Sequence, residues 1–203
     1  MVPARPPWLL RVLMPGALWR VPTPERVLYL TFDDGPDPDL TPWVLEQLAA
    51  ADARATFFCR GDRAAARPDL VARMHAAGHA VGGHTWDHPD GWRTRLRPYL
   101  RNVLRGQRTL GGTLFRPPYG RLTPAQYTAL GRRYRLVMWD VLTGDWDHRL
   151  SPQRCLLRTL RATRPGSIVV FHDAPKAAER LRSVLPAALE RWRREGYRFA
   201  SLA

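Results

Sequence analysis

Short apolar runs recur along this chain, and each is separated from the next by a segment with helical character. The runs predict seven strands, at residues 27–30, 55–59, 80–82, 113–115, 135–139, 167–171 and 197–202. Strands that alternate with helices are typical of a parallel sheet, because the helices make the crossover connections. The simplest arrangement of seven such units is a distorted, seven-stranded α/β barrel.

The segments between the strands begin and end with helix signals. Thr41 and Ser151 each stand before a proline, which is typical of a capped helix start, and Gly78 is typical of a helix end. We expect helices at residues 41–51, 68–77, 93–110, 124–130, 152–161 and 177–195. A chain of 203 residues without a shift in composition favours one domain. Residues 26–203 carry the repeating pattern, and residues 1–25 are expected to be an N-terminal extension packed on the outside of the barrel.

Polar side chains follow the predicted strands at the points where the strands end. Asp33 and Asp34 come directly after the first strand, and Gly35-Pro36 turns the chain behind them. Because the carboxyl ends of parallel strands meet at one rim of a barrel, residues far apart in sequence are expected to converge there. The full set of such residues is Asp33, Asp34, His84, His88, Arg116, Asp145 and His172.

A metal ion is the simplest explanation of this set. Two adjacent carboxylates stay ionised together only when a cation lies beside them. His84 and His88 supply two imidazoles four residues apart, and a carboxylate completes a three-ligand site. Taken singly, an Asp-Gly-Pro turn or a His-x-x-x-His spacing is more often structural, so the co-occurrence carries the prediction. Two histidines and a carboxylate also form the site of non-haem iron oxygenases, which stay open as an alternative at this point.

The net charge of +14 comes almost entirely from arginine, since Lys176 is the one lysine in the sequence. The arginines are spread along the predicted helices and do not gather in a run, which favours a solvated surface. We therefore expect no specific nucleic-acid partner. A module that binds an anionic polymer through its positive charge remains a non-enzymatic alternative.

Neither the cysteines nor the N-terminal segment predicts export. Cys59 and Cys155 are too few and too distant for a disulfide framework or a metal knuckle. The apolar stretches at residues 8–10 and 12–19 lack a clean signal-peptide cleavage site, and no run reaches the ~18 apolar residues of a spanning helix. We expect no transmembrane span and a monomer, with a peripheral membrane contact as an alternative for the extension. The default compartment is then the cytoplasm or the inner face of the membrane.

In their order along the chain, these segments resemble the polysaccharide deacetylases of the NodB homology class, carbohydrate esterase family 4. The resemblance covers about residues 26–203 and rests on five motifs, at residues 31–34, 84–88, 116–120, 145–146 and 168–172. Val170 stands where the family more often has leucine, which reshapes an apolar pocket slightly. The resemblance implies a NodB-like barrel and a metal-dependent deacetylase. Such an enzyme hydrolyses the acetamide of N-acetylated sugars in a polysaccharide or oligosaccharide and releases acetate.

The resemblance also implies a role for each motif residue. Asp34, His84 and His88 would hold one divalent metal, Zn²⁺ before Co²⁺, Ni²⁺ or Mn²⁺. Asp33 would be the general base that activates water, with Arg116 as its partner.

The remaining roles concern the oxyanion, the leaving group and the sugar. The backbone N–H of Tyr119 would stabilise the oxyanion, and His172, oriented by Asp145, would protonate the departing amine. Tyr119, Trp146 and Val170 would line the substrate pocket. Asp140 and Asp147 are close rivals of Asp145 in the sequence. Peptidoglycan, chitin oligomers, an exopolysaccharide and a lipid-linked sugar all present the same acetamide, so the glycan stays open.

Overall fold

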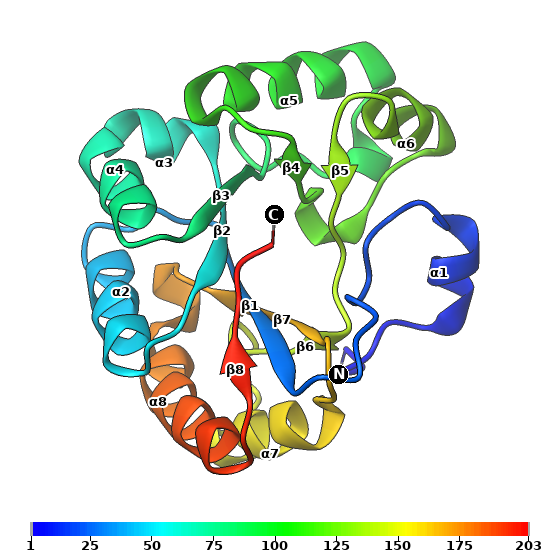
Figure 1. Cartoon of the computed structure of the whole chain (residues 1–203). Coiled ribbons are helices and arrows are strands. Elements are labelled where there is room, and N and C mark those ends of the chain that lie inside the picture. The colour runs from blue at the N-terminus through cyan, green and yellow to red at the C-terminus, as the bar shows by residue number, and fades with distance from the viewer. Residues whose placement is uncertain (1, 203) are drawn as a thin grey trace.

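The structure, a computed structural model, describes residues 2–202 and contains a curled parallel sheet surrounded by helices (Figure 1). Seven strands follow the order β5-β4-β3-β2-β1-β7-β6, and β8 pairs with the start of β1. The strands are β1 (Val27–Asp33), β2 (Ala55–Cys59), β3 (Ala80–Gly83), β4 (Leu114–Phe115), β5 (Arg135–Leu136), β6 (Val141–Leu142), β7 (Ile168–His172) and β8 (Arg198–Phe199). The predicted distorted, seven-stranded α/β barrel is confirmed.

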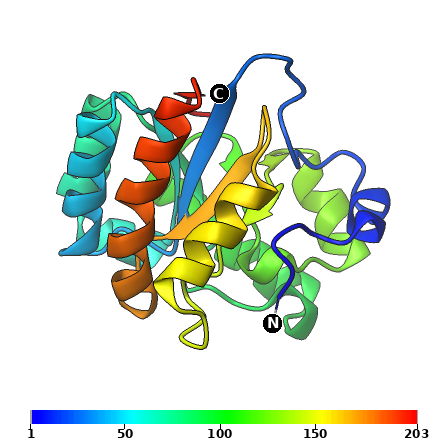
Figure 2. The same cartoon turned by 90° about the horizontal axis from the view of Figure 1, so that it is seen from below.

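Helices cover the outer face of this sheet, and Figure 2 shows α7 and α8 packed along one side of it. Ser151 caps its helix as predicted, accepting a hydrogen bond from Arg154 N, and the Thr123 hydroxyl likewise accepts one from Gln126 N. The prediction for Thr41 is wrong, because α2 begins at Leu40 and the Thr41 hydroxyl donates to Asp173 instead. The helices are α1 (Trp8–Leu13), α2 (Leu40–Ala50), α3 (Gly61–Ala66), α4 (Pro68–Ala76), α5 (Leu96–Leu110), α6 (Pro124–Gly131), α7 (Pro152–Ala162) and α8 (Ala178–Arg194). All six predicted helices are present, and α1 and α3 are additions. The predicted ranges include no helix in the N-terminal extension that holds α1, and the sequence of α3 has no apolar period.

The expected strand at residues 135–139 is wrong in one respect, since the chain there forms two short strands. β5 and β6 lie at opposite ends of the strand order, and residues 137–140 cross from one to the other. Leu18 fills part of this gap: its N–H donates to Leu136 O at 2.8 Å, and its carbonyl accepts from Met138 N at 2.8 Å. The curvature of the sheet brings its two edges round to each other, so one short segment of chain can span them.

The first strand separates the core from the site by simple alternation of its side chains. Phe32 packs outward, stacked between Phe57 at 5.1 Å and Phe171 at 5.7 Å between ring centroids. Thr31 and Asp33 point to the opposite face of the sheet, into the barrel. Burying a large apolar side chain such as Phe32 contributes roughly 1.5–3 kcal/mol, so the register of this strand is firmly fixed.

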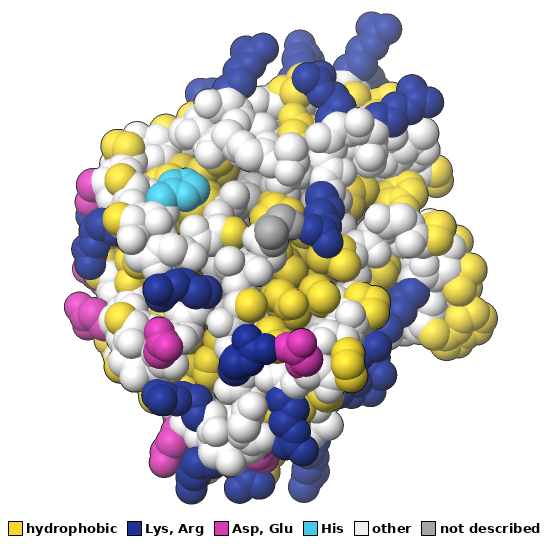
Figure 3. Space-filling view, viewed as in Figure 1, with side chains coloured by type: hydrophobic (Ala, Val, Ile, Leu, Met, Phe, Trp, Pro, Cys, Tyr) yellow, Lys and Arg dark blue, Asp and Glu magenta, His cyan; other side chains and the backbone are white. Residues whose placement is uncertain are grey.

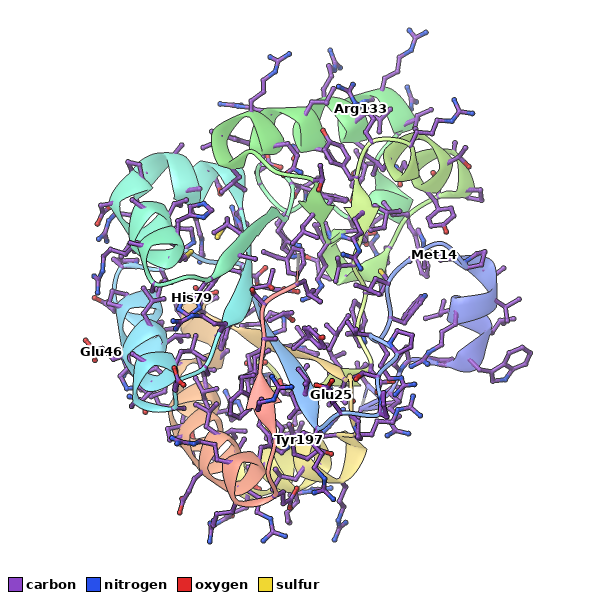
Figure 4. All side chains as sticks on the ribbon, viewed as in Figure 1. Met14, Glu25, Glu46, His79, Arg133 and Tyr197 are labelled. Atoms are coloured by element: carbon purple, nitrogen blue, oxygen red, sulfur yellow. The ribbon has the colours of Figure 1, made fainter. Side chains whose placement is uncertain are left out.

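A second apolar cluster joins the N-terminal extension to the rest of the molecule. Met14, labelled in Figure 4, is buried with Ala17 and Trp19 against Tyr99 and Leu130 on α5 and α6. By contrast, α1 itself contributes no buried side chain. The apolar packing of the extension therefore comes mainly from the segment after α1, while Arg11 on α1 pairs with Asp140 at 2.6 Å.

The basic residues lie on the outside, as the sequence indicates. On the face shown in Figure 3, Lys and Arg side chains form separate groups along the upper and lower margins and do not merge into one patch. Within residues 2–202, no helix combines the length and the apolar character needed to cross a membrane.

Candidate active site

A cavity of about 300 Å³ lies at the carboxyl ends of the strands. Several strand ends reach it, because the barrel gathers them on one rim. Its lining includes Asp33, His84, His88, Tyr119, Trp146, Val170 and His172.

Asp34, His84 and His88 form a compact cluster on one wall of this cavity, with one possible ligand atom of each within 4.8 Å of the others. Asp34 Oδ1 lies 3.1 Å from His88 Nε2 and 3.6 Å from His84 Nε2. This oxygen is buried and makes no well-formed hydrogen bond in the described part of the chain. An orphaned buried oxygen facing two imidazoles fits a divalent cation, which would satisfy all three groups.

The pKa of the Asp34 carboxyl lies well below its usual range. Burial alone would raise this pKa, but the adjacent His88, together with His172 and His84, outweighs it. Asp34 is thus a carboxylate, as a metal ligand must be.

His84 has the protonation state and orientation of a metal ligand. Its Nδ1–H donates to the carbonyl oxygen of Arg116 at 2.7 Å, because a carbonyl can only accept. Nε2 is left facing Asp34. Burial lowers the pKa of His84 to about 4, against the opposing effect of Asp33 and Asp34. The imidazole is therefore neutral near pH 7.

The loop that carries the histidines is held in an unusual backbone conformation. Thr85 and His88 have positive φ angles of 67° and 69°. The Thr85 hydroxyl donates to His84 O and accepts from His88 N at 3.0 Å. Asn102 on α5 holds the loop from outside, accepting from Trp86 N and donating to Asp87, both at 2.7 Å. These contacts fix two left-handed residues that sequence pattern alone does not indicate.

Asp33 lies next to the Asp34–His84–His88 cluster, but its carboxylate is paired with an arginine and not with the histidines. Arg116, fully buried, donates from Nη1 to Asp33 Oδ1 at 2.7 Å and to the Thr31 hydroxyl at 2.7 Å. Its Nη2 donates to Met138 O at 2.8 Å. Burial lowers the pKa of Arg116, with Asp33 opposing, yet a guanidinium stays charged at any ordinary pH. Asp33 is thus a carboxylate held in one orientation, with Oδ1 engaged by Arg116.

On the opposite wall, His172 pairs with Asp145 through two contacts. The ring Nδ1 lies 2.9 Å from Asp145 Oδ1, and the His172 backbone N–H donates to Asp145 Oδ2 at 2.7 Å. Burial lowers the pKa of His172, but Asp145, Asp34 and Asp33 together outweigh burial, and the pKa is raised above its ordinary value. Arg180 Nε donates to the Asp145 carbonyl at 2.7 Å, which positions the loop.

The two rivals of Asp145 are engaged elsewhere. Asp140 accepts from Arg11, Arg164 and Ser167, at distances from 2.6 to 3.0 Å. Asp147 pairs with Arg149 at 2.9 Å. Of the three aspartates, only Asp145 hydrogen-bonds to His172 within residues 2–202.

The predicted substrate residues line the same cavity. Tyr119 is 58% exposed, has a φ of 58°, and meets His88 edge to face at 4.7 Å between ring centroids. Trp146 meets His172 in the same manner at 4.8 Å. Val170 is buried on β7 and forms part of the floor. Two aromatic side chains therefore flank the opening, and each touches one of the histidines.

Two residues near the site escape the sequence interpretation. Lys176 reaches Asp34 Oδ2 with its ammonium at 2.7 Å. Asp173 accepts from Gly35 N at 3.1 Å and from the Thr41 hydroxyl, and burial raises its pKa to about 7. A Cβ atom at Gly35 would lie 2.0 Å from Asp173, so the turn after Asp34 requires glycine. The only sequence signal for the contact between Asp173 and Gly35 is that Asp173 directly follows the candidate site residue His172.

Comparison with known proteins connects this geometry to one family. The family model described as polysaccharide deacetylase matches residues 20–135. A chitooligosaccharide deacetylase of a Bradyrhizobium species is 38% identical, over 76% of this chain and 74% of the relative. A peptidoglycan-N-acetylglucosamine deacetylase of Listeria monocytogenes is 32% identical over 88% of this chain, which spans only 38% of that relative's length. A solved peptidoglycan N-acetylglucosamine deacetylase superposes with a TM-score of 0.87 at 28% identity, over 92% of this chain and 91% of that one.

Proposed function

This chain belongs to the polysaccharide deacetylase family, and we propose that it hydrolyses the acetamide of an N-acetylated sugar in a polysaccharide or oligosaccharide, releasing acetate. One observation carries this proposal. The Asp33–Arg116 pair, the His172–Asp145 pair and the Asp34–His84–His88 cluster all reach one cavity. Amide hydrolysis needs these three elements together: a base, an acid and a place for the carbonyl oxygen.

We propose that Asp34, His84 and His88 hold one divalent metal, with zinc as the first choice and Co²⁺, Ni²⁺ or Mn²⁺ as alternatives. One carboxylate and two imidazoles suit zinc and leave positions for water and substrate. A metal bound there would polarise the acetamide carbonyl and make a bound water easier to deprotonate. The neutral state of His84 supports this assignment, because a protonated imidazole cannot ligate.

Asp33 is the proposed general base, since Arg116 keeps it from acting as a second carboxylate donor to the Asp34–His84–His88 cluster. It takes one proton from the attacking water, whose oxygen bonds to the acetamide carbon. The charge that develops on the carbonyl oxygen would be met by the backbone N–H of Tyr119. Arg116 fixes the orientation of the Asp33 carboxylate through the 2.7 Å hydrogen bond from its Nη1 to Asp33 Oδ1.

His172 is the proposed general acid. When the carbon–nitrogen bond breaks, the nitrogen needs a proton to leave as a neutral amine, and His172 supplies it. Asp145 orients the ring and favours its protonated form through the 2.9 Å contact with Nδ1. Trp146 and Tyr119 would stack on the sugar rings, with Val170 beside the acetyl methyl.

The two alternative functions lose support for specific reasons. An oxygenase site needs two histidines and a carboxylate but gives no role to the Asp33–Arg116 and His172–Asp145 pairs. A module that only binds an anionic polymer likewise has no use for a positioned acid and base. Acetate release from a panel of N-acetylated glycans by the zinc-loaded protein would support the deacetylase over both alternatives. Salt-sensitive polymer binding without any acetate release would support the binding module instead.

We also propose that residues 26–203 form the catalytic domain and that residues 1–25 are an extension packed on it as part of a monomer. The buried Met14 and Trp19 and the pairing of Leu18 with β5 support this division. A single light-scattering mass near 23.2 kDa would support the monomer.

The extension offers a surface for peripheral contact with an anionic membrane. Four large side chains on α1, Trp8, Leu9, Val12 and Leu13, are 51–74% exposed, and Figure 1 shows α1 at the margin of the barrel. A basic hollow lies between the extension and α7, and its lining includes Arg5 of the extension and Arg154, Arg158 and Arg161 of α7. Sedimentation of the protein with phosphatidylglycerol vesicles, but not with phosphatidylcholine vesicles, would support the contact. The double variant Trp8→Ser, Leu13→Ser should no longer sediment with either.

A further inference from the structure

A second cavity, of about 320 Å³, adjoins the candidate active site. Asp34, His88, Tyr119 and Lys176 contribute to its lining, and three of them also line the first cavity. The outer walls come from Arg60 and Arg63, at the start of α3 and within it. A glycan bound with its acetamide at the metal cluster could therefore extend one neighbouring unit into this basic space.

The positive charge of Arg63 has no counterpart in the structure. Its Nη1 is buried and has no hydrogen-bond partner among residues 2–202, and none of the ion pairs there includes it. Other arginines near the site are matched by carboxylates: Arg60 pairs with Asp62, and Arg121 pairs with Asp90. An unpartnered buried guanidinium nitrogen is costly unless a ligand completes it.

Lys176 adds donors on the boundary between the two cavities. One contact of its ammonium goes to Asp34 Oδ2 at 2.7 Å, and the side chain remains 51% exposed. Because an ammonium has three donors, the others are available to a bound molecule. Asp34, the carboxylate in the lining of this cavity, is engaged by His88 and Lys176, and the nearby Asp62 is engaged by Arg60.

We propose that this second cavity is a subsite for an oxyanion, a carboxylate or a phosphate, carried by the sugar unit next to the one that is deacetylated. The planar guanidinium of Arg63 matches the geometry of either group, and the ammonium of Lys176 supplies a second charge. The substrate class is then an acidic N-acetylated glycan. This inference rests on the proposed deacetylase function and narrows its substrate.

The test measures binding to the zinc-loaded Asp33→Asn protein by calorimetry. Three tetrasaccharides are compared: neutral chitotetraose, the same tetramer with one phosphate group, and an alternating tetramer whose lactyl groups carry free carboxylates. We expect at least one acidic tetramer to bind roughly ten-fold tighter than the neutral one, a size typical of a charge-assisted hydrogen bond. The tetramer that binds tighter identifies the carboxylate or the phosphate.

The advantage of the acidic tetramer should disappear when Arg63→Gln is added and persist when Arg108→Gln is added. Arg108 is exposed on α5 and lines neither cavity, so it controls for the loss of one positive charge. Arg63→Lys should keep part of the advantage. Equal affinity for all three tetramers, or an advantage that survives Arg63→Gln, would overturn the subsite. Acetate release from neutral chitotetraose by the wild type would show in that case that the deacetylase function itself stands, and its failure on all three would count against that function.

Discussion

His84 and His172 lie in the same cavity, each beside a carboxylate, yet their pKa values move in opposite directions. Burial lowers the pKa of His84 to about 4. His172 is also well shielded, with only 13% of its side chain exposed, but Asp145, Asp34 and Asp33 raise its pKa. One imidazole is therefore held neutral and the other tends to be cationic.

The difference comes from which ring atom each partner meets. For His84, Nδ1 donates to a neutral backbone carbonyl, so nothing nearby compensates a positive ring at that end. For His172, Nδ1 meets a carboxylate at 2.9 Å, which compensates a positive ring directly. A neutral ring is what a metal requires, and a cationic ring is what a leaving amine requires. The comparison indicates that the second hydrogen bond of a histidine, more than its depth, decides its chemistry.

The largest expected effect comes from removing the neutral side of the comparison. His84→Ala combined with His88→Ala deletes two of the three proposed ligands, so metal content should fall from about one ion per chain to near zero, and acetate release should vanish with it. Elemental analysis of protein purified without chelator measures this. Unchanged metal content in the double variant would remove the metal assignment.

Asp33→Asn should separate the base from the ligands. The substitution keeps the shape of the side chain but removes its basicity, so turnover should fall ~10²–10⁴-fold while the metal stays bound. Steady-state acetate release and elemental analysis of the same preparation provide the two readings. Loss of the metal instead of turnover would mean that Asp33 and Asp34 have exchanged roles.

His172→Ala tests the cationic side. The rate should fall by about 10²-fold or more, and the decline of rate at high pH should disappear, because that decline reports deprotonation of the acid. Metal content should equal that of the wild type, in contrast to the ligand variants. A near-normal rate with an unchanged decline at high pH would require another group, or water, to protonate the amine.

Asp145→Asn is expected to give the smallest change and the most specific one. Asp145 raises the pKa of His172, so its neutral replacement lowers that pKa, and the ring loses its proton at a lower pH. The decline of rate on the alkaline side should therefore move to lower pH, with the rate at acidic pH less affected. Glu190→Gln, on the exposed surface of α8 away from the cavity, is a matched control that should leave the profile in place. An unchanged pH–rate profile in Asp145→Asn would mean that Asp145 does not set the pKa of His172 in the working enzyme.

Much of the fold follows from the sequence because its apolar runs are short and regularly spaced. β2 and the helices α2, α4, α7 and α8 lie within about two residues of their predicted bounds, and β1 runs three residues beyond its predicted end. The segment at residues 135–142 could not be read correctly, since one apolar run there serves both edges of the sheet. Whether a run continues as one strand depends on curvature, which is a property of the whole barrel.

The candidate site residues, with the Asp33–Arg116 and His172–Asp145 pairs, could be named from the sequence motifs, but most of the other contacts around the site could not. Asp140 and Asp145 are five residues apart and look alike in the sequence, and only long-range contacts separate them. Arg11 lies 129 positions from Asp140, and His172 lies 27 positions from Asp145. The contacts of Lys176 with Asp34 and the unpartnered nitrogen of Arg63 depend in the same way on packing between distant segments.

The most direct test of the account is a zinc titration of chelator-stripped protein, followed by acetate release from an N-acetylated oligosaccharide. For the wild type, we expect release to rise with added zinc and to level off at one ion per chain. His172→Ala should bind the same single ion but release far less acetate, because the three proposed metal ligands are intact and the proposed general acid is missing. Zinc that binds the wild type at one ion per chain with no acetate released from any N-acetylated glycan would contradict the account.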